Sequence, residues 1–573
     1  MQRKVLHRKS IDTEIEKVAA RYAKDPESIL EVLLELHASR GVLNEDDIGD
    51  VAHELSIPAE RAFGVSTFYS LLQAPKKTIR VCDGPACWLK GAANVRSMLE
   101  SQSTIGEGFV ENNIYTERSS CLGLCDLAPA VLIGETQSGP FDIEHDLELG
   151  EGRNGGIPNY GQPIPGENRV LLQHAGDIDP KDIDSAIAFG AYQALQKALT
   201  EPRLKIIDEL EISGLRGRGG AGFPVGKKWR FVAEAESDEK FIICNADESE
   251  PLTFKDRVVI DSNPQRILEG MLLAGYAVGA QSGFIYVRGE YTSQLKRLES
   301  AIQQAEEKGW LGENIQGSGF SFHIHLHRGA GAYICGEETA LIESLEGKRG
   351  EPRIRPPYPA NSGYHGKPTV VNNVETLAYV PDIIQHGGKW YLSIGDPTTP
   401  GTKLYTLVGN INRPGLFEAP YGITLRKVIE EFGDGMSPGC EFHFALTGGA
   451  AGTIVSKDYL DIPIDYSSSV DGVSLGSGAI LICDQTVSPL FMLRELMYFF
   501  EVESCGKCTS CRIGTHNVRI NLDRIIAGKK SKGDKETLLN LATQLQDTSF
   551  CGLGQSAAMP IQSAVRNFEQ FFI

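Results

Sequence analysis

Apolar residues near the start of the chain recur with helical spacing. One stripe lies behind an Asp-Pro pair and ends at a glycine, and it comprises Ile29, Leu30, Leu33, Leu34 and Leu36. An acidic cap followed by proline suits the first turn of a helix, and glycine suits its end. Two further short helical segments follow at 43–56 and 58–72. The pattern therefore predicts an N-terminal helical region over residues 1–75.

The pattern changes to strand, loop and helix after residue 76, with another strand near 128–134. This predicts a small α/β domain over residues 76–134. Residues 135–168 are rich in glycine, proline and acidic residues, which is typical of a linker.

Strands and helices alternate over a longer stretch that begins at Arg169. Apolar strand-like runs at 241–246, 283–289 and 320–327 are interleaved with helical patterns at 263–278 and 291–309. We expect a layered α/β domain over 169–399, a small β-rich domain over 400–488 and a helical region over 489–573. The fold class is thus α/β multidomain.

Composition limits the function classes. The 573 residues include 41% hydrophobic and 23% charged residues, which is ordinary for a globular protein. The net charge of −19 disfavours nucleic acid or anionic lipid as a general partner. No apolar run reaches the roughly 20 residues that span a bilayer. The polar N-terminus does not resemble a signal peptide, so we expect a cytoplasmic protein whose cysteines stay reduced.

Cysteines near the C-terminus have the spacing of iron–sulfur ligands. Cys505, Cys508 and Cys511 form a C-x2-C-x2-C run, and Cys551 supplies a distant fourth thiol. Neighbouring thiolates at this spacing can reach different corners of one [4Fe–4S] cluster. A zinc site or buried thiols are the alternatives, although zinc sites more often pair two C-x2-C hairpins.

A second cysteine set lies in the predicted 76–134 domain. Cys82 and Cys87 are spaced C-x4-C, and Cys121 and Cys125 are spaced C-x3-C. Thiolates from two such loops can hold a [2Fe–2S] cluster, with a disulfide pair or a zinc loop as alternatives. For the remaining cysteines we expect buried packing roles: Cys244, Cys335, Cys440 and Cys483.

Two glycine-rich loops and one acidic loop suggest a nucleotide pocket. Residues 214–229 hold six glycines with interleaved cations, and 328–347 lead from glycines into a probable helix. Backbone N–H groups can approach phosphate where glycines lie, although such a loop is often only a loop. Residues 244–251 place Asp247, Glu248 and Glu250 in one turn. Carboxylates that bind ribose hydroxyls repel a 2′-phosphate, which favours NAD over NADP; a solvated acidic loop is the alternative.

Three alternating histidines form a possible metal motif. His323, His325 and His327 could share one face of a strand. An ordinary strand edge before the glycine loop is the favoured interpretation.

These motifs together carry a specific resemblance. Residues 169–573 resemble the NADH- and FMN-binding subunit of respiratory complex I, on the segments 217–229, 244–251, 329–347, 355–377, 503–515 and 549–554. Residues 1–135 resemble the thioredoxin-like [2Fe–2S] subunit of the same complex. Fused in this order, the two parts look most like the diaphorase flavoprotein subunit of soluble NAD-reducing [NiFe]-hydrogenase.

The resemblance implies a fold and a set of site residues. It implies a thioredoxin-like [2Fe–2S] domain, a Rossmann-like FMN/NADH domain, a β-grasp-like domain and a helical [4Fe–4S] domain. No side chain acts as acid or base; Glu250, Lys228 and Phe223 would align the hydride transfer. The implied cofactor-binding residues are Gly217, Arg218, Gly219, Gly220, Phe223, Lys228, Phe231, Asn245, Asp247, Glu248, Ser249, Glu250, Tyr333, Gly336, Glu337, Glu338, Tyr358, Asn372 and Asn373.

The chemistry that the resemblance implies links two-electron and one-electron carriers. FMN exchanges hydride with NAD(H) and single electrons with the [4Fe–4S] cluster. The partners would be a ferredoxin-like iron–sulfur diaphorase subunit and [NiFe] hydrogenase subunits in a hetero-oligomer, without nucleic acid or membrane. The alternatives are an NAD-linked formate dehydrogenase, a complex I variant or a non-enzymatic metal-binding scaffold. In two places the sequence departs from the family, since Val225 replaces a common Thr and Tyr358 a common Phe.

Overall fold

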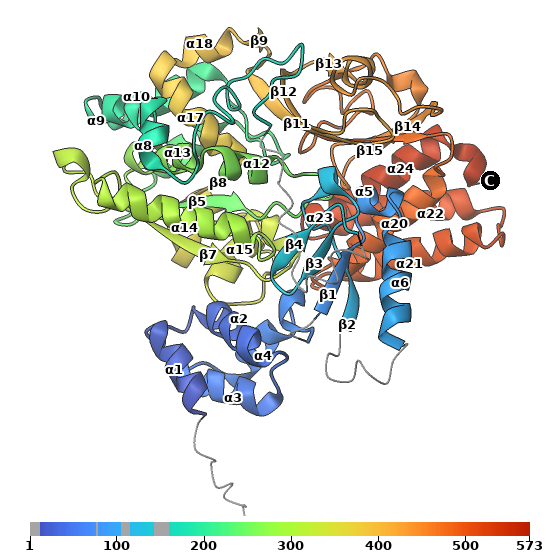
Figure 1. The fold of residues 1–573 in the computed structure, drawn as a ribbon, viewed down its shortest axis with the longest axis horizontal. Helices are drawn as coiled ribbons and strands as arrows, with labels where there is room; N and C mark the ends of the chain where they lie inside the picture. Colours follow the sequence, from blue (N-terminus) through green and yellow to red (C-terminus); the bar gives the residue numbers. More distant parts are fainter. Residues whose placement is uncertain (1–11, 76–77, 105–114, 143–159, 573) are drawn as a thin grey trace, which may run out of the picture.

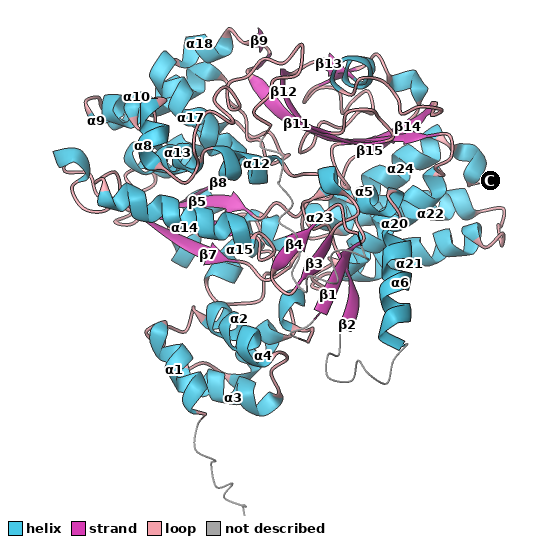
Figure 2. Ribbon diagram, in the orientation of Figure 1, coloured by secondary structure: helices cyan, strands magenta, loops and turns pink. Residues whose placement is uncertain are grey.

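The computed structural model describes residues 12–75, 78–104, 115–142 and 160–572. It contains the mixed helical and sheet domains that the sequence predicts, so the α/β multidomain class is confirmed (Figures 1 and 2). Half of the predicted 135–168 linker, residues 143–159, lies outside the described residues. No helix in the described part of the chain is long and apolar enough to cross a membrane.

The N-terminal helices form a small lobe of their own below the sheets in Figure 1. Their apolar residues, such as Leu33 and Val51, are completely buried between the helices. Asn44 starts one helix with a capping box, in which its side chain accepts hydrogen bonds from the N–H groups of Asp46 and Asp47. The helices are α1 (Thr13–Arg21), α2 (Ile29–Arg40), α3 (Glu45–Glu54) and α4 (Ala59–Ser66).

The next domain is built on a mixed sheet with strand order β2-β1-β3-β4. Its strands are β1 (Thr78–Cys82), β2 (Tyr115–Ser119), β3 (Val131–Ile133) and β4 (Thr136–Ser138), and its helices are α5 (Pro85–Leu89) and α6 (Ala92–Thr104). Strand β4 pairs with β3, so the sheet continues to Ser138, four residues into the segment predicted as a linker. The polar composition of that segment concealed a short edge strand, in which Gln137 and Ser138 are buried.

The largest domain has a parallel sheet with strand order β7-β6-β5-β8. The strands are β5 (Phe241–Ala246), β6 (Ser282–Val287), β7 (His323–Arg328) and β8 (Thr369–Asn373). The helices that pack around it are α10 (Arg203–Ser213), α11 (Val225–Glu234), α12 (Lys255–Ser262), α13 (Pro264–Val278), α14 (Thr292–Glu307), α15 (Glu338–Leu345) and α17 (Val374–His386). Because chain order reverses between β5 and β8, a crevice is expected at the carboxyl ends of these two strands.

A second mixed sheet follows, with strand order β12-β11-β17-β14-β15. Its strands are β11 (Thr402–Gly409), β12 (Gly415–Pro420), β14 (Phe442–Thr447), β15 (Thr453–Val455) and β17 (Ala479–Asp484). The chain then becomes helical, with α20 (Pro489–Val502), α21 (Thr509–Ile526), α22 (Asp534–Thr548), α23 (Gly552–Ser556) and α24 (Ala558–Asn567). These helices lie at the right of Figure 1, beside the second sheet.

Candidate functional site

A cavity of about 630 Å³ opens where the parallel sheet predicts a crevice. Asn245 near the end of β5 and Asn373 at the end of β8 both line it. This volume lies within the range of small-molecule and cofactor sites. The switch point of the sheet, together with the loops above it, therefore creates a site of cofactor size.

Ten of the predicted cofactor residues line this cavity. They come from the first glycine loop, the acidic loop after β5, the second glycine loop and the end of β8: Gly219, Gly220, Asn245, Asp247, Glu248, Glu250, Tyr333, Gly336, Glu337 and Asn373. These segments lie far apart in the sequence, and the sheet brings them together.

The other nine predicted residues lie outside the cavity lining. Several adjoin lining residues in the sequence, while Phe223, Phe231 and Tyr358 have exposed fractions of 46%, 53% and 55%. Lys228 donates to the carbonyl of Val371 at 3.0 Å. The nine residues are Gly217, Arg218, Phe223, Lys228, Phe231, Ser249, Glu338, Tyr358 and Asn372.

Arg218 differs most from its predicted role. Its guanidinium is buried among aromatic rings and donates to the Tyr391 hydroxyl at 2.6 Å and the Thr402 carbonyl at 3.1 Å. The sequence suggested that this cation faces phosphate, but the side chain joins the first glycine loop to the second sheet. Burial of the long side chain against Tyr421 explains why it turns away from the cavity.

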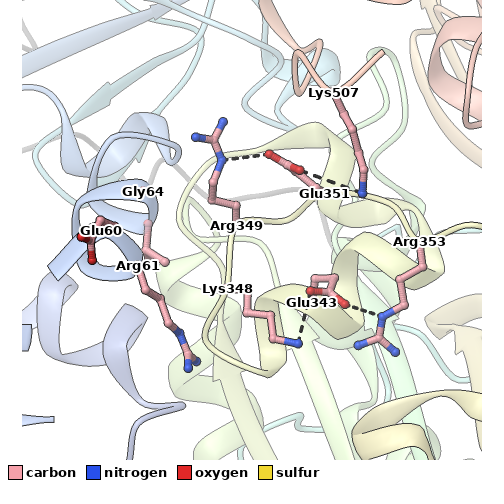
Figure 3. A pocket seen from close by; sticks show the side chains of 10 residues that line it. Glu60, Arg61, Gly64, Glu343, Lys348, Arg349, Glu351, Arg353 and Lys507 are labelled. Atoms are coloured by element: carbon pink, nitrogen blue, oxygen red, sulfur yellow. Dashed lines mark hydrogen bonds and ion pairs between the residues drawn. The ribbon is translucent and has the colours of Figure 1, made fainter. Parts of the chain in front are cut away.

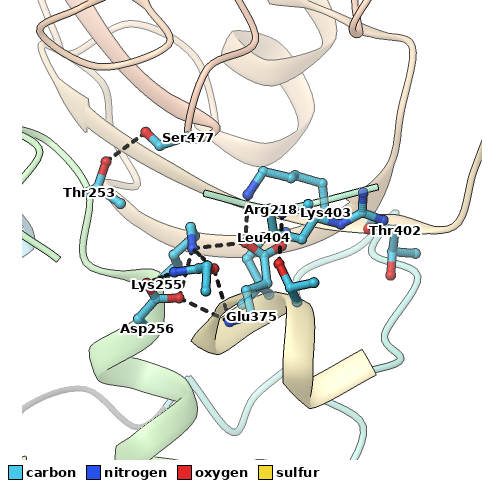
Figure 4. A network of polar contacts seen from close by, with 12 residues as sticks. Arg218, Thr253, Lys255, Asp256, Glu375, Thr402, Lys403, Leu404 and Ser477 are labelled. Carbon is cyan, nitrogen blue, oxygen red and sulfur yellow. Dashed lines mark hydrogen bonds and ion pairs between the residues drawn. The ribbon is translucent and has the colours of Figure 1, made fainter. Parts of the chain in front are cut away.

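A buried charge network that the sequence did not reveal lies beneath the cavity (Figure 4). Lys255, which lines the cavity, donates to Asp256 at 2.7 Å, and its Nζ lies 3.0 Å from Glu375 and 3.1 Å from Asn373 Oδ1. Glu375 also accepts from Lys403 at 2.6 Å. Burial by itself would lower the pKa of the Lys255 ammonium. The nearby carboxylates of Asp256 and Glu375 have a larger combined effect and raise it. The cavity therefore has a permanent cation in its wall.

The acidic loop after β5 provides carboxyl groups that are partly or fully buried. Glu250 accepts from the Ala451 N–H at 3.0 Å and from the Tyr333 hydroxyl. Burial raises its pKa to about 7. Burial likewise raises the pKa of Asp247 well above its ordinary value. Glu248 caps α12 by accepting from the N–H groups of Asp256 and Arg257 at 2.7 and 3.0 Å.

The cavity has polar groups that a ligand could satisfy. Asp247 Oδ2 and Glu337 Oε1 are buried without a hydrogen-bond partner among the described residues. Such atoms are costly unless a bound group pairs with them. Gly220 has φ +118°, a conformation that favours glycine. The residues present thus fit a cofactor that lies close to the backbone and offers hydrogen-bond donors.

The second sheet and the C-terminal helices complete the cavity wall. None of their contributions was predicted: Gly448, Ala451, Asp465, Tyr466, Ser469, Ser474, Leu475, Gly476, Ser477, Gly552, Leu553, Ser556 and Met559. Apart from Gly552 and Leu553, which lie in the motif of the fourth C-terminal cysteine, they belong to no motif, and each reaches the cavity only through the packing of whole domains. The glycine turns at 448–449 and 476 were the one sequence signal that could have suggested a close backbone approach.

The C-terminal cysteines converge around a small cavity beside the first one. Cys505, Cys508, Cys511 and Cys551 all line it. Burial raises the pKa of Cys551 to about 11, while the backbone N–H groups of Leu553 and Gly554 act in the opposite direction. Such N–H groups can donate to a sulfur that is bound to a cluster, and these hydrogen bonds help to set the reduction potential of the cluster. Ile334 and Leu553 line both cavities, so the thiols lie directly behind the wall of the cofactor site.

The N-terminal cysteines also converge. Cys121 and Cys125 have their Sγ atoms 3.3 Å apart, and the Gly123 N–H points at the Cys121 sulfur from 3.4 Å. Cys82 ends β1 and Cys87 lies on α5, and both are buried. Hydrogen bonds from Cys125 and Cys82 hold the pKa of Cys121 well below its ordinary value. This arrangement favours the thiolate of Cys121, which is the form that binds iron.

The alternating histidines do not share a site. His327 is buried and its ring lies 2.7 Å from the Glu31 carboxylate of α2, whereas His323 pairs with Glu313 at 3.1 Å. Within the described ranges, no group of three or more His, Cys, Asp or Glu side chains is gathered tightly enough to hold a metal ion. Thiolates around a multi-iron cluster lie farther apart than the ligands of one ion, so this finding concerns single-ion sites. Of the remaining cysteines, Cys244, Cys335 and Cys483 are buried as expected. The expectation is wrong for Cys440, which is partly exposed and whose thiol donates to Asp484 at 3.0 Å.

A third cavity, of about 340 Å³, lies between α4 and the loop after α15 (Figure 3). Its lining is rich in cations, but these are already engaged. Arg353 pairs with Glu343, Arg349 lies 3.0 Å from Glu351, and Lys507 donates to the Pro352 carbonyl at 2.7 Å. Arg61 of α4 donates to the carbonyls of Glu346 and Gly347, so this cavity marks a hydrogen-bonded contact between the N-terminal lobe and the large domain.

Comparison with protein families matches three parts of the chain. Residues 15–146 match the thioredoxin-like [2Fe-2S] ferredoxin, residues 210–382 the Nuo51 FMN-binding domain, and residues 491–573 the NADH-ubiquinone oxidoreductase-F iron–sulfur binding region. An NADH-quinone oxidoreductase chain of this type in Rhizobium meliloti is 44% identical over 406 residues, covering 70% of this chain and 96% of the relative. The chain belongs to this NADH-quinone oxidoreductase family.

Hydrogenases contain other relatives of the chain. The HndC subunit of the NADP-reducing hydrogenase of Solidesulfovibrio fructosivorans is 46% identical, covering 70% of this chain and 82% of the relative. A crystal structure of NAD+-reducing [NiFe]-hydrogenase in the H2-reduced state contains a chain with a TM-score of 0.83 and 32% identity. The match covers 96% of this chain and 92% of that chain. The cofactor set expected from the sequence, FMN with [2Fe–2S] and [4Fe–4S] clusters in a chain of an NADH-binding family, is confirmed.

Proposed function

We propose that this chain is the NAD(H)-oxidoreductase, or diaphorase, subunit of a cytoplasmic NAD-reducing [NiFe]-hydrogenase. The observation that carries the proposal is the wall shared by two sites. Ile334 and Leu553 each line both the cofactor cavity and the cavity of the C-terminal thiols. The cofactor cavity and the site of the four thiols therefore lie next to each other, which suits passage of single electrons between them.

Bound FMN supplies the ability to exchange a hydride with a nicotinamide and single electrons with a cluster. Gly219 and Gly220 would let the backbone approach it, while Asn245 and Asn373 flank it at the strand ends. Asp247 Oδ2 offers a buried oxygen without a hydrogen-bond partner, and Glu337 Oε1, which also lacks one, lies 3.5 Å from an Arg355 nitrogen. Of the predicted residues outside the cavity lining, Phe223, Phe231 and Tyr358 would form the rim over which NAD(H) lies, because their aromatic rings are exposed. The buried ones, such as Arg218, would support the site from behind.

Glu250 would select the dinucleotide. Its carboxyl group lines the cavity and is held in place by the Ala451 N–H and the Tyr333 hydroxyl. A carboxylate at this position can accept from ribose hydroxyls and repels a 2′-phosphate. The family includes an NADP-reducing relative, so the fold alone does not fix this choice.

The likeness over 96% of the chain to a hydrogenase structure supports the choice of complex. The net reaction would be H2 + NAD+ to NADH + H+, with hydrogen oxidised in a partner subunit that holds the [NiFe] centre. A ferredoxin-like iron–sulfur subunit would connect the two sites. The grouped thiols, spaced as metal ligands rather than as a disulfide framework, support a reducing cytoplasm.

A test has two parts. The full chain, purified without oxygen, should release a flavin on acid treatment and should reduce an artificial one-electron dye with NADH as the only donor. Co-purification from the native host should then recover a nickel-containing partner. A chain that holds zinc in place of iron and lacks flavin would contradict the diaphorase assignment and favour a scaffold.

A complex I variant is the second candidate, because two NADH-quinone oxidoreductase relatives are 44% and 45% identical over 70% and 67% of this chain. The N-terminal fusion and the match over nearly the whole chain favour the hydrogenase. Recovery of quinone-reducing membrane subunits without nickel would reverse this order, and a molybdopterin partner would indicate a formate dehydrogenase.

A further inference from the structure

One buried arginine joins two of the three redox sites of the chain. Arg288 follows β6 and is only 2% exposed. One end of its guanidinium donates to the carbonyl of Cys121 at 2.6 Å, and the other donates to the carbonyl of Glu248 at 2.6 Å. Cys121 belongs to the [2Fe–2S] set, and Glu248 lines the cofactor cavity. The same cation thus contacts a ligand residue of one site and a wall residue of the other.

The surroundings of Arg288 are buried and closely packed. A Cβ at Gly123, between the two loop cysteines, would lie 2.2 Å from the Tyr291 hydroxyl. That hydroxyl donates to Glu248 at 3.1 Å, so the cysteine loop and the acidic loop pack on the same ring. The cation pairs with Glu290, which accepts from it at 3.0 Å and is itself 7% exposed. Charges in such an environment interact strongly because little water screens them.

We propose that Arg288 is a positioning residue that raises the reduction potential of the [2Fe–2S] cluster and holds the cluster loop against the cofactor cavity. The proposal rests on the cofactors of the proposed function. Reduction adds one electron to the cluster and therefore one negative charge. A buried cation bonded to the carbonyl of a ligand residue stabilises that charge, and Glu290 partly offsets the effect.

The alternative is a purely mechanical brace, and the chain offers a control for it. Arg328 crosses the same domain boundary, donating to the Gly289 carbonyl at 3.1 Å and to Glu135 at 2.8 Å. It lies opposite Val287, the neighbour of Arg288, in the pairing of β6 with β7. An effect that depends only on bracing the domains would follow from either substitution, whereas an electrostatic effect on the cluster would follow only from changes at Arg288 and Glu290.

The experiment is a redox titration of the [2Fe–2S] signal by electron paramagnetic resonance, on the full chain purified anaerobically. We expect Arg288→Gln to disfavour cluster reduction by about tenfold, which is about 59 mV for a one-electron couple. Glu290→Gln should shift the potential in the opposite direction. Arg328→Gln should leave it unchanged, and Arg288→Lys, which keeps the charge, should recover most of the loss.

The outcomes separate the hypotheses. An unchanged potential in an Arg288→Gln protein with a normal cluster signal would overturn the proposal. If that variant fails to assemble the cluster, Glu290→Gln decides, because an upward shift supports the electrostatic role and no shift refutes it. Equal shifts in the Arg328 and Arg288 variants would also refute it. Dye reduction by the unaltered chain with NADH tests the diaphorase function separately.

Discussion

Replacement of Glu250 by glutamine should abolish a pH-dependent preference for NAD over NADP. Burial raises the pKa of this carboxyl group to about 7, so it is neutral below that pH and ionised above it. A 2′-phosphate meets repulsion only from the ionised form. The sign follows directly: discrimination against NADP should increase as the pH rises through 7, and glutamine, which cannot ionise, should show no such increase.

The repulsion between Glu250 and the 2′-phosphate sets an upper limit on the discrimination against NADP. A carboxylate about 5 Å from a phosphate charge, at an effective dielectric constant of about 20, contributes roughly 3 kcal/mol, or on the order of a hundredfold in affinity. Near the pKa, however, NADP can bind the form of the enzyme in which Glu250 is protonated. The affinity for NADP then falls only by the free energy needed to protonate Glu250 at that pH. The expected discrimination from Glu250 is therefore about twofold at pH 7, about tenfold at pH 8 and about fiftyfold at pH 9.

The assay compares kcat/KM for NADH and NADPH with a one-electron dye between pH 6 and pH 9. The unaltered chain should show a selectivity ratio that increases with pH, and Glu250→Gln should show a flat ratio near the low-pH value. Asp465→Asn serves as the matched control, because Asp465 lines the same cavity but its carboxylate is engaged by the N–H groups of Ser467 and Ser468. A flat ratio in the unaltered chain, or an equal change in the control, would refute the ribose assignment.

Three further substitutions test other parts of the site. Cys508→Ser should leave flavin reduction by NADH intact but slow onward electron transfer, and stopped-flow spectra with normal cluster reduction would reject that role. Gly220→Ala should weaken FMN retention about tenfold, because φ +118° is strained for alanine. The flavin fluorescence of an ultrafiltrate measures how much FMN is released. Gly312→Ala is the control, because Gly312 also has a positive φ, +99°, but lies in open space. Arg257→Ala should reduce the free energy of unfolding by about 3 kcal/mol, because it leaves the buried Asp126 carboxylate without its cation and with only the Tyr160 hydroxyl among its described partners. Urea denaturation should show a much smaller loss for Arg328→Ala, which removes the more exposed pair with Glu135.

Local patterns in the sequence correctly indicated much of the fold. The stripe from Ile29 to Leu36 lies in α2 and is largely buried, and the apolar run at 241–246 coincides with β5. Both follow from short-range rules, because periodicity and capping act within a few residues. The end of the small α/β domain was misplaced by four residues, since β4 is short and polar and its assignment depends on its pairing with β3.

The cysteine spacings, the glycine loops and the acidic loop after β5 determined by themselves which chemistry this protein carries, because ligand spacing and backbone freedom are encoded by neighbouring residues. The tertiary structure alone decided that Arg218 turns into the second sheet, that Lys255 provides the cavity's buried cation, and that Arg288 links Cys121 to Glu248. It also decided that Ile334 and Leu553, more than two hundred positions apart, form one wall between two cavities. Such contacts arise when whole domains pack against each other. This packing is driven by burial of apolar surface, which depends on the shape and area of the domain surfaces, and no local motif encodes these.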